Sequence, residues 1–230
     1  MKSNYAFIFA RGGSKGIINK NIKLFNNKPL IYYSISLANK IKEIKKVFVS
    51  SDSKKILKIA KKYGAYTILR PKNISKDNSS EVDAWKHAVR YLKNKGEDFD
   101  NFISLPCTSP LRAEIDIKLA IKKIKKKNDF VLGISKSNMS PNFNLVKVIK
   151  KKLSLLEPKK FSVNRQVAKK IFNITTVVYA CNSKFILKLK KSYWEGNVKF
   201  IEIPKIRSID IDDIVDFKVA EIIMKNKIYS

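Results

Sequence analysis

The most constraining feature of this sequence is a regular alternation of short apolar runs and longer amphipathic stretches. Parallel strands must be joined by crossovers of helix length, so this alternation is typical of βαβ units in an α/β fold with a mostly parallel sheet. We expect strands at about residues 5–9, 47–49, 66–69, 101–105, 130–134, 177–180 and 198–203. Helices are expected at about residues 29–38, 54–63, 81–92, 184–189 and up to 225, with a further helix running to Lys127.

One stretch interrupts this alternation. The chain has 230 residues and is 44% hydrophobic, enough for a single domain over residues 1–230 with a real core. From about residue 135 to residue 173 the pattern holds only hairpin-like pieces, near 146–149 and 153–156. We predict that this insertion is a lid or an oligomer contact.

The loop after the first strand is rich in glycine and cations. It reads Ala10-Arg11-Gly12-Gly13-Ser14-Lys15-Gly16, and Lys20 and Asn21 follow shortly after. Backbone N–H groups and positive charges in such a loop can surround phosphates. The alternative is an ordinary glycine turn. The spacing fits neither the Walker A loop nor the dinucleotide fingerprint G-x-G-x-x-G, so any phosphate is bound in another way.

Two further polar segments follow predicted strands, where ligands collect in open α/β sheets. Residues 70–80 form a polar loop that starts at Arg70. Residues 106–112 place Thr108 and Ser109 between two prolines, in a rigid turn that can present hydroxyl groups to a ligand. A turn that only caps the next helix explains the second segment equally well.

Aspartates cluster near the C-terminus of this basic chain, with four of them between residues 210 and 216. In an extended backbone, Asp210 and Asp212 point to the same side, as oxygen ligands of Mg²⁺ would. Alternatively, Asp212 and Asp213 only cap the final helix. Both can hold, with Asp213 and Asp216 starting the helix and Asp210 and Asp212 binding the metal.

Composition narrows the class of protein. The net charge is +30, but only six of the 49 basic residues are arginine, and the lysines are spread along the whole chain. We interpret this charge as a compositional bias and do not expect nucleic-acid binding. No window is apolar enough to span a membrane, so we expect a cytoplasmic protein. Cys107 and Cys181 are expected to be free thiols, and the single histidine, His87, to be structural.

Taken together, these motifs resemble the acylneuraminate cytidylyltransferases, the enzymes that make CMP-sialic acids. The resemblance covers essentially the whole chain in the right order. It is carried by residues 10–16, Lys20-Asn21, Arg70-Pro71, Thr108-Ser109-Pro110-Leu111-Arg112, Arg165-Gln166 and Ser208-Ile209-Asp210-Ile211-Asp212. It implies a Rossmann-like three-layer α/β/α nucleotidyltransferase that joins CMP from CTP to the anomeric hydroxyl of an acidic 2-keto sugar and releases pyrophosphate, usually as a homodimer.

The resemblance also implies roles for individual residues. Arg11, Lys15 and Asp210 would be catalytic, and Asp210 and Asp212 would hold Mg²⁺. The nucleotide would be bound by Ala10, Arg11, Gly13, Ser14, Lys15, Lys20, Asn21, Arg70, Ser79 and Ser80. The sugar would be bound by Thr108, Ser109, Arg165 and Gln166.

Departures from the family pattern fall on the sugar side. Pro106 stands where sialic acid-specific members have glutamine, Met139-Ser140-Pro141 replaces a His-Pro or His-Ser-Pro, and residues 172–179 lack an arginine and an Asn-Gly pair. A site built to bond particular hydroxyl and amide groups discriminates sharply when those partners change. We therefore expect another nonulosonic acid, such as legionaminic or pseudaminic acid, with a Kdo-type or other sugar as the alternative. The product would serve surface-glycan biosynthesis.

Overall fold

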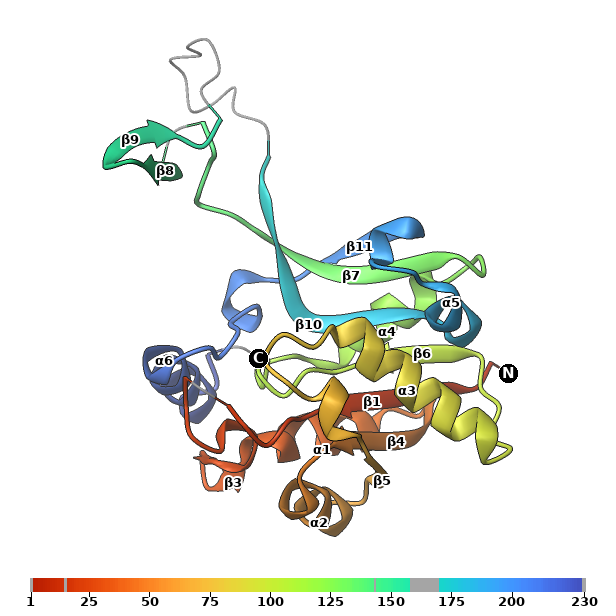
Figure 1. Ribbon diagram of the computed structural model, residues 1–230. Helices are drawn as coiled ribbons and strands as arrows, with labels where there is room; N and C mark the ends of the chain where they lie inside the picture. The colour runs from red at the N-terminus through yellow and green to blue at the C-terminus, as the bar shows by residue number, and fades with distance from the viewer. Residues whose placement is uncertain (1, 15, 143, 158–169, 229–230) are drawn as a thin grey trace.

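A computed structural model describes residues 2–14, 16–142, 144–157 and 170–228, and its main element is a seven-stranded sheet (Figure 1). The strand order is β11-β7-β10-β6-β1-β4-β5. All neighbours pair in parallel except β10, which is antiparallel to both β6 and β7. The bounds are β1 (Asn4–Phe9), β4 (Ile44–Ser51), β5 (Tyr66–Leu69), β6 (Asn101–Ser104), β7 (Asp129–Lys136), β10 (Phe172–Asn182) and β11 (Asn197–Glu202).

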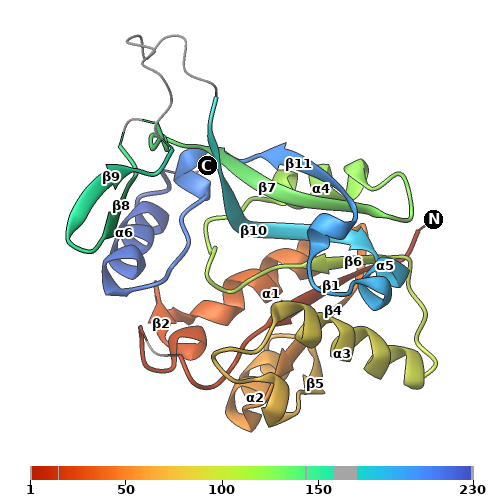
Figure 2. The same ribbon diagram turned by 45° about the horizontal axis from the view of Figure 1, so that its top comes forward.

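Helices cover both faces of this sheet (Figure 2). They are α1 (Leu30–Lys40), α2 (Lys54–Lys62), α3 (Glu81–Asn94), α4 (Glu114–Lys123), α5 (Ser183–Lys188) and α6 (Ile214–Lys225). Alternate residues of β1 face opposite layers, as the pleat requires. Ala6 and Ile8 share a buried cluster with residues of α1, α2 and α4, whereas Tyr5 and Phe7 share another with residues of α3 and α5. The predicted three-layer α/β/α fold is therefore confirmed.

The remaining elements are small. Two short hairpins are formed by β2 (Leu24–Phe25) with β3 (Lys28–Pro29) and by β8 (Val146–Ile149) with β9 (Lys152–Leu155). Single turns of 3₁₀ helix are η1 (Lys20–Ile22), η2 (Lys72–Ile74), η4 (Tyr193–Glu195) and η5 (Lys205–Arg207). No helix in the described ranges is long and apolar enough to cross a membrane. Both cysteines are buried free thiols, as expected.

Two of the differences between the structure and the sequence-based expectation concern β10 and α4. Strand β10 starts at Phe172, well before the expected residue 177, and contains a bulge between Thr175 and Tyr179. Helix α4 ends at Lys123 and not at Lys127, because the N–H groups of Lys125 and Lys126 donate to the carboxylate of Asp129 instead of continuing the helix. Asp129, whose side chain ends this helix, lies beyond the helix end and is not a residue type that marks helix ends in a sequence.

Asp129 is a buried carboxylate that ties α4, β7 and β11 together. Besides the two backbone donors, Lys199 Nζ lies 2.5 Å and Asn197 Nδ2 2.7 Å from its oxygens. Burial alone would raise the pKa of Asp129, but the hydrogen bonds from Lys199 and the backbone outweigh it and hold the pKa well below its usual range. The ionised form is therefore the one that stabilises the fold.

We expect Asp129→Asn to lower the free energy of unfolding by about 3 kcal/mol, because Lys199 and two N–H groups lose a charged acceptor. Urea unfolding measures this. Because the folded pKa is depressed, the stabilisation is present above the unfolded pKa of about 3.9 and lost as pH falls through the folded pKa. The exposed Glu202→Gln on β11 is the control. A loss no larger than that of the control would contradict this account.

Candidate nucleotide-binding site

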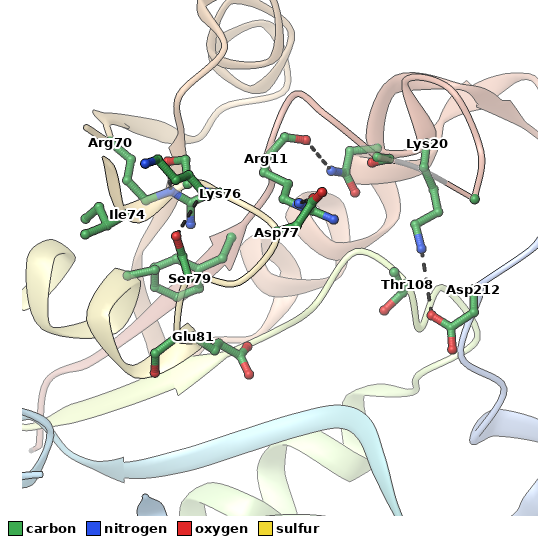
Figure 3. A pocket seen from close by; sticks show the side chains of 17 residues that line it. Arg11, Lys20, Arg70, Ile74, Lys76, Asp77, Ser79, Glu81, Thr108 and Asp212 are labelled. Atoms are coloured by element: carbon green, nitrogen blue, oxygen red, sulfur yellow. Dashed lines mark hydrogen bonds and ion pairs between the residues drawn. The ribbon is translucent and has the colours of Figure 1, made fainter. Parts of the chain in front are cut away.

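A pocket of about 440 Å³ opens where β1 and β5 end, at the carboxyl edge of the parallel strands. Its walls come from the loop after β1, the loop after β5, the first turn of α3, Thr108 and Asp212 (Figure 3). Ligands of open α/β sheets bind at this edge. In Figure 3, Arg70 and Ile74 lie toward one end of the pocket and Lys20 and Asp212 toward the other.

The glycine-rich loop after β1 is held from two sides. The N–H of Gly12 donates to Asp52 Oδ1 at 2.9 Å, and the side-chain amide of Asn21 donates to the carbonyl of Arg11 at 3.1 Å. Asn21 is buried and also lines the pocket. Ser53 caps α2, which leaves the carboxylate of Asp52 to fix the loop.

Cations from this loop face the pocket. Arg11 forms an ion pair with Asp77 of the opposite wall. Lys20 Nζ donates to the carbonyl of Ile211 at 2.6 Å and lies 4.0 Å from Asp212 Oδ1. Ser14 lines the same end of the pocket, whereas Lys15 lies outside the described residues. This end can therefore neutralise several negative charges, as a polyphosphate requires.

The other end of the pocket combines apolar walls with polar edges. Phe9, Ile74 and Ala84 supply the apolar contacts. Arg70 is buried, its Nε donates to Ser75 Oγ at 2.9 Å, and burial lowers the pKa of its guanidinium. Apolar contacts combined with a few polar groups are typical of small-molecule sites.

Two predicted nucleotide-binding serines also shape this end. Ser79 Oγ accepts the N–H of Lys76 at 2.9 Å, and Ser80 caps α3 by accepting the N–H of Val82. Both serines line the pocket. The loop that carries them is thus fixed by its own side chains and by the start of a long helix.

Glu81, the first residue of α3, faces the pocket (Figure 3). The residue is exposed at the pocket. Desolvation by the surrounding protein raises the pKa of its carboxyl to about 7, the charge of Asp210 adds to the rise, and the charge of Arg70 opposes it. Sequence reasoning missed Glu81, although its place directly after two predicted ligand serines was a usable signal.

Two aspartates from the segment before α6 approach the pocket. Asp212 lines it, and burial and the charge of Asp210 raise the pKa of its carboxyl. Asp210 Oδ1 is buried and has no hydrogen-bond partner among the described residues. Asp213 and Asp216 form a capping box at the start of α6, as predicted, so the helix does not need Asp210 or Asp212.

These two carboxylates suit a magnesium ion. No group of three or more His, Cys, Asp or Glu side chains in the described ranges could hold a metal ion by itself. Mg²⁺, however, commonly takes one or two carboxylates and completes its shell with water and substrate phosphates. The orphaned oxygen of Asp210 fits such a role, because an ion would satisfy an acceptor that the protein leaves unpaired.

Thr108 and Ser109, both predicted to bind the sugar, lie in different environments. Thr108 lines the pocket, and its carbonyl accepts the N–H of Ile211 at 2.8 Å. Ser109 is fully buried, and its Oγ lies 2.7 Å from Thr176 Oγ1 in the bulge of β10. Arg165 and Gln166 lie outside the described residues.

The buried Arg112 holds this turn against the bulge. Its guanidinium donates to the carbonyls of Val177 and Pro106, at 2.6 Å each, and to Ser34 Oγ at 2.8 Å. Burial lowers the pKa of Arg112 to about 10. Bulges often re-aim strands beside active sites, and here the bulge brings β10 against the turn that carries Thr108.

Most of the predicted site residues that are described meet in the pocket. Its walls include Arg11, Ser14, Lys20, Asn21, Arg70, Ser79, Ser80, Thr108 and Asp212. Ala10, Gly13, Ser109 and Asp210 are described but are not among the lining residues. Sequence reasoning missed Glu81. It also missed the apolar lining residues Phe9, Ile74 and Ala84, because scattered apolar residues form no motif.

The fold is that of an α/β protein whose pocket, at the carboxyl edge of the parallel strands, combines cationic side chains, carboxylates and apolar walls. A family model described as Cytidylyltransferase matches residues 5–220. The chain is 31% identical to post-translational flagellin modification protein B of Campylobacter coli, over 96% of this chain and 94% of that protein. It is 30% identical to pseudaminic acid cytidylyltransferase of Campylobacter jejuni (serotype O:2), over 96% of each. The chain belongs to the cytidylyltransferase family.

A solved structure shares the fold. The structure of CMP:2-keto-3-deoxy-manno-octonic acid synthetase complexed with CTP superposes with a TM-score of 0.73 at 15% sequence identity, and the match covers 98% of this chain and 99% of that one. At this identity the likeness concerns the fold alone.

Proposed function

We propose that this chain transfers CMP from CTP to the anomeric hydroxyl of a sialic-acid-like nonulosonic acid, releases pyrophosphate, and uses Mg²⁺. The observation that carries the proposal is one pocket lined by Arg11 of the glycine-rich loop, by Lys20 and Asp212, and by the apolar side chains of Phe9, Ile74 and Ala84. Membership of the cytidylyltransferase family supports CTP as the donor. The name of the C. jejuni relative supports a nonulosonic acid as the acceptor.

In this reaction the anomeric oxygen attacks the α-phosphorus in line. A new oxygen–phosphorus bond forms, the bond to the bridging oxygen of pyrophosphate breaks, and the hydroxyl proton leaves the acceptor. Arg11 and Lys20, together with Lys15, would offset the charge that builds on the departing pyrophosphate. Arg70 and the apolar end would fix the nucleoside, so catalysis is mainly positioning.

Asp210 and Asp212 would hold the magnesium ion. When bound, the ion neutralises phosphate oxygens and orients them. The protein's contribution is to fix the two carboxylates relative to the glycine-rich loop. Lys20 does so from one side through its bond to the Ile211 carbonyl, between the two aspartates.

The proposed sugar follows from the residues predicted to contact it that differ from the family pattern. Pro106 cannot donate the hydrogen bonds of a glutamine amide, and its carbonyl is already bonded to Arg112. We therefore propose a nonulosonic acid other than plain N-acetylneuraminate, such as pseudaminic or legionaminic acid. Thr108, Arg165 and Gln166 would belong to the acceptor subsite, and the buried Ser109 would support it from behind through Thr176.

A panel of the four nucleoside triphosphates against several keto-acid sugars tests this function, with pyrophosphate release in the presence of Mg²⁺ as the readout. We expect CTP to be used at least 100-fold more efficiently than the other triphosphates and pseudaminic or legionaminic acid to exceed N-acetylneuraminate. Efficient release with an eight-carbon Kdo-type acid would contradict the proposed acceptor. Release with another triphosphate would contradict the proposed donor.

We further propose that the chain forms a homodimer through the β8–β9 hairpin. Figure 1 shows this hairpin projecting away from the seven-stranded sheet. Val146 and Val148 pair with Leu155 and Leu153, which places four apolar side chains on one face. Val148 and Leu153 are 67% and 69% exposed. An isolated two-stranded hairpin is marginally stable in water. Contact with the hairpin of a second copy would bury its apolar face.

Light scattering coupled to gel filtration tests the dimer. The wild type is expected at twice the mass of one chain, and the double variant Val148→Glu/Leu153→Glu at the mass of one, because charges replace the apolar contact. The control is Lys147→Glu on the opposite face of the same strand. A dimeric double variant would place the contact elsewhere, and a monomeric wild type would contradict the homodimer.

A further inference from the structure

Glu81 is an acid that lines the pocket proposed for an anionic substrate. No Lys, Arg or His of the described chain forms an ion pair with it, although the charge of Arg70 acts to lower its pKa. It is fixed in place as the first residue of α3, after the Ser80 cap. With a pKa of about 7 the carboxyl is ionised above neutral pH, and the ionised acid would repel phosphates, so it has to face an uncharged part of the substrate.

The position of Glu81 along the pocket indicates which part of the substrate it would face. In Figure 3 its carboxylate lies between Ser79 and Arg70 on one side and Thr108, Lys20 and Asp212 on the other. The first group lines the pocket with the apolar Ile74, where the base would bind. The second group includes Lys20, which would bind the phosphates. In a nucleotide, the group between the base and the phosphates is the ribose.

The chemistry of the ribose fits a carboxylate. Its 2′- and 3′-hydroxyls are two neighbouring donors, and a carboxylate offers two oxygens that only accept. Nucleotide sites on related α/β architectures use an acidic residue for the ribose 2′-hydroxyl in this way. Arg70 carries only donors and so cannot serve these hydroxyls as an acceptor.

We propose that Glu81 is a specificity-determining residue that accepts hydrogen bonds from the ribose hydroxyls and makes the site select ribonucleotides over 2′-deoxyribonucleotides. The inference rests on the proposed function in taking CTP as the ligand. It also assigns a role to Glu81, a residue that is not part of the motifs shared with the family.

Calorimetric titration of CTP and dCTP in Mg²⁺ buffer, without any sugar, tests this inference. The wild type is expected to bind CTP about 10- to 100-fold more tightly than dCTP, because dCTP leaves a carboxylate oxygen unpaired. In Glu81→Ala the ratio is expected to fall to about two or less. The fall should come from weaker CTP binding, with dCTP affinity nearly unchanged. Glu81→Gln, which keeps the shape and one acceptor oxygen, is expected to lie between.

The control is Asp83→Asn, which removes an acid from the same first turn of α3, outside this pocket. It should leave the CTP-to-dCTP ratio unchanged. An unchanged ratio in both Glu81 variants would overturn the inference, as would equal losses of CTP and dCTP affinity. Altered discrimination between CTP and UTP, with the ribose preference intact, would also overturn it and assign Glu81 to the base.

The outcomes separate this inference from the proposed function. A wild type that binds CTP with the expected ribose preference but forms no product with any keto-acid sugar would contradict the proposed function only. A wild type that turns over CTP and a nonulosonic acid but does not distinguish CTP from dCTP would contradict the role of Glu81 only.

Discussion

Asp210→Asn is expected to lower kcat about 10³-fold while the protein stays folded. The substitution removes one charge from the pair that would hold Mg²⁺ at the phosphates. Asp210 Oδ1 has no partner among the described residues, so no described hydrogen bond to that atom is lost with the charge. Steady-state pyrophosphate release at saturating Mg²⁺ measures kcat, and thermal unfolding checks the fold.

A neighbouring aspartate is the matched control for this experiment. Asp213 accepts the N–H groups of Val215 and Asp216 as the cap of α6. Asparagine caps helices about as well as aspartate, so Asp213→Asn is expected to keep kcat within a few-fold of the wild type. If Asp210→Asn kept more than a tenth of the wild-type kcat, Asp210 would not be a metal ligand in turnover.

Gly16→Ala is expected to lower kcat/KM about 100-fold, because it separates the two halves of the site. A Cβ atom at residue 16 would lie 2.6 Å from the carbonyl oxygen of Asp212, far inside van der Waals contact. The atom that it meets is backbone and cannot rotate away. The glycine-rich loop or the Asp212 segment must therefore move, and displacements of about 1 Å in an active site can cost about 100-fold in rate.

The control for Gly16→Ala comes from the same loop. A Cβ atom at Gly13 would have no atom within 4 Å. Gly13→Ala keeps the backbone N–H that would bind phosphate and adds a methyl group that meets no protein atom, so we expect a loss of kcat/KM of about tenfold at most. Similar losses in both variants would mean that loop flexibility, and not the contact with Asp212, limits turnover.

Much of the fold was predictable because strand and helix periods are local. The strand at 66–69 was predicted to the residue, and the caps at Asp213 and Asp216 followed from their positions before an apolar helix. The antiparallel direction of β10 was not predictable in this way. It depends on pairing with β6 and β7, which lie far away in the chain, and its bulge depends on Arg112 reaching the Val177 carbonyl.

The lining of the pocket was predictable where a motif carries its chemistry. Residue type and order predicted Arg11, Lys20, Arg70 and Asp212 as site residues, and the structure brings them to one pocket, whereas Lys15 lies outside the described residues. Asp52 and Glu81 were not identified, since each stands at a helix start, where an acid has an ordinary structural explanation. Only the three-dimensional structure shows that Asp52 bonds the Gly12 N–H and that Glu81 faces the pocket.

The central claim is that this chain forms a phosphodiester between CMP and the anomeric oxygen of a nonulosonic acid. Phosphorus NMR of the wild type with CTP, Mg²⁺ and pseudaminic or legionaminic acid tests it directly. The account predicts one new phosphodiester resonance, with one pyrophosphate for each CTP consumed and the mass of a CMP-sugar in the product. Pyrophosphate accompanied only by free CMP, or no consumption of CTP with any keto-acid sugar, would contradict it.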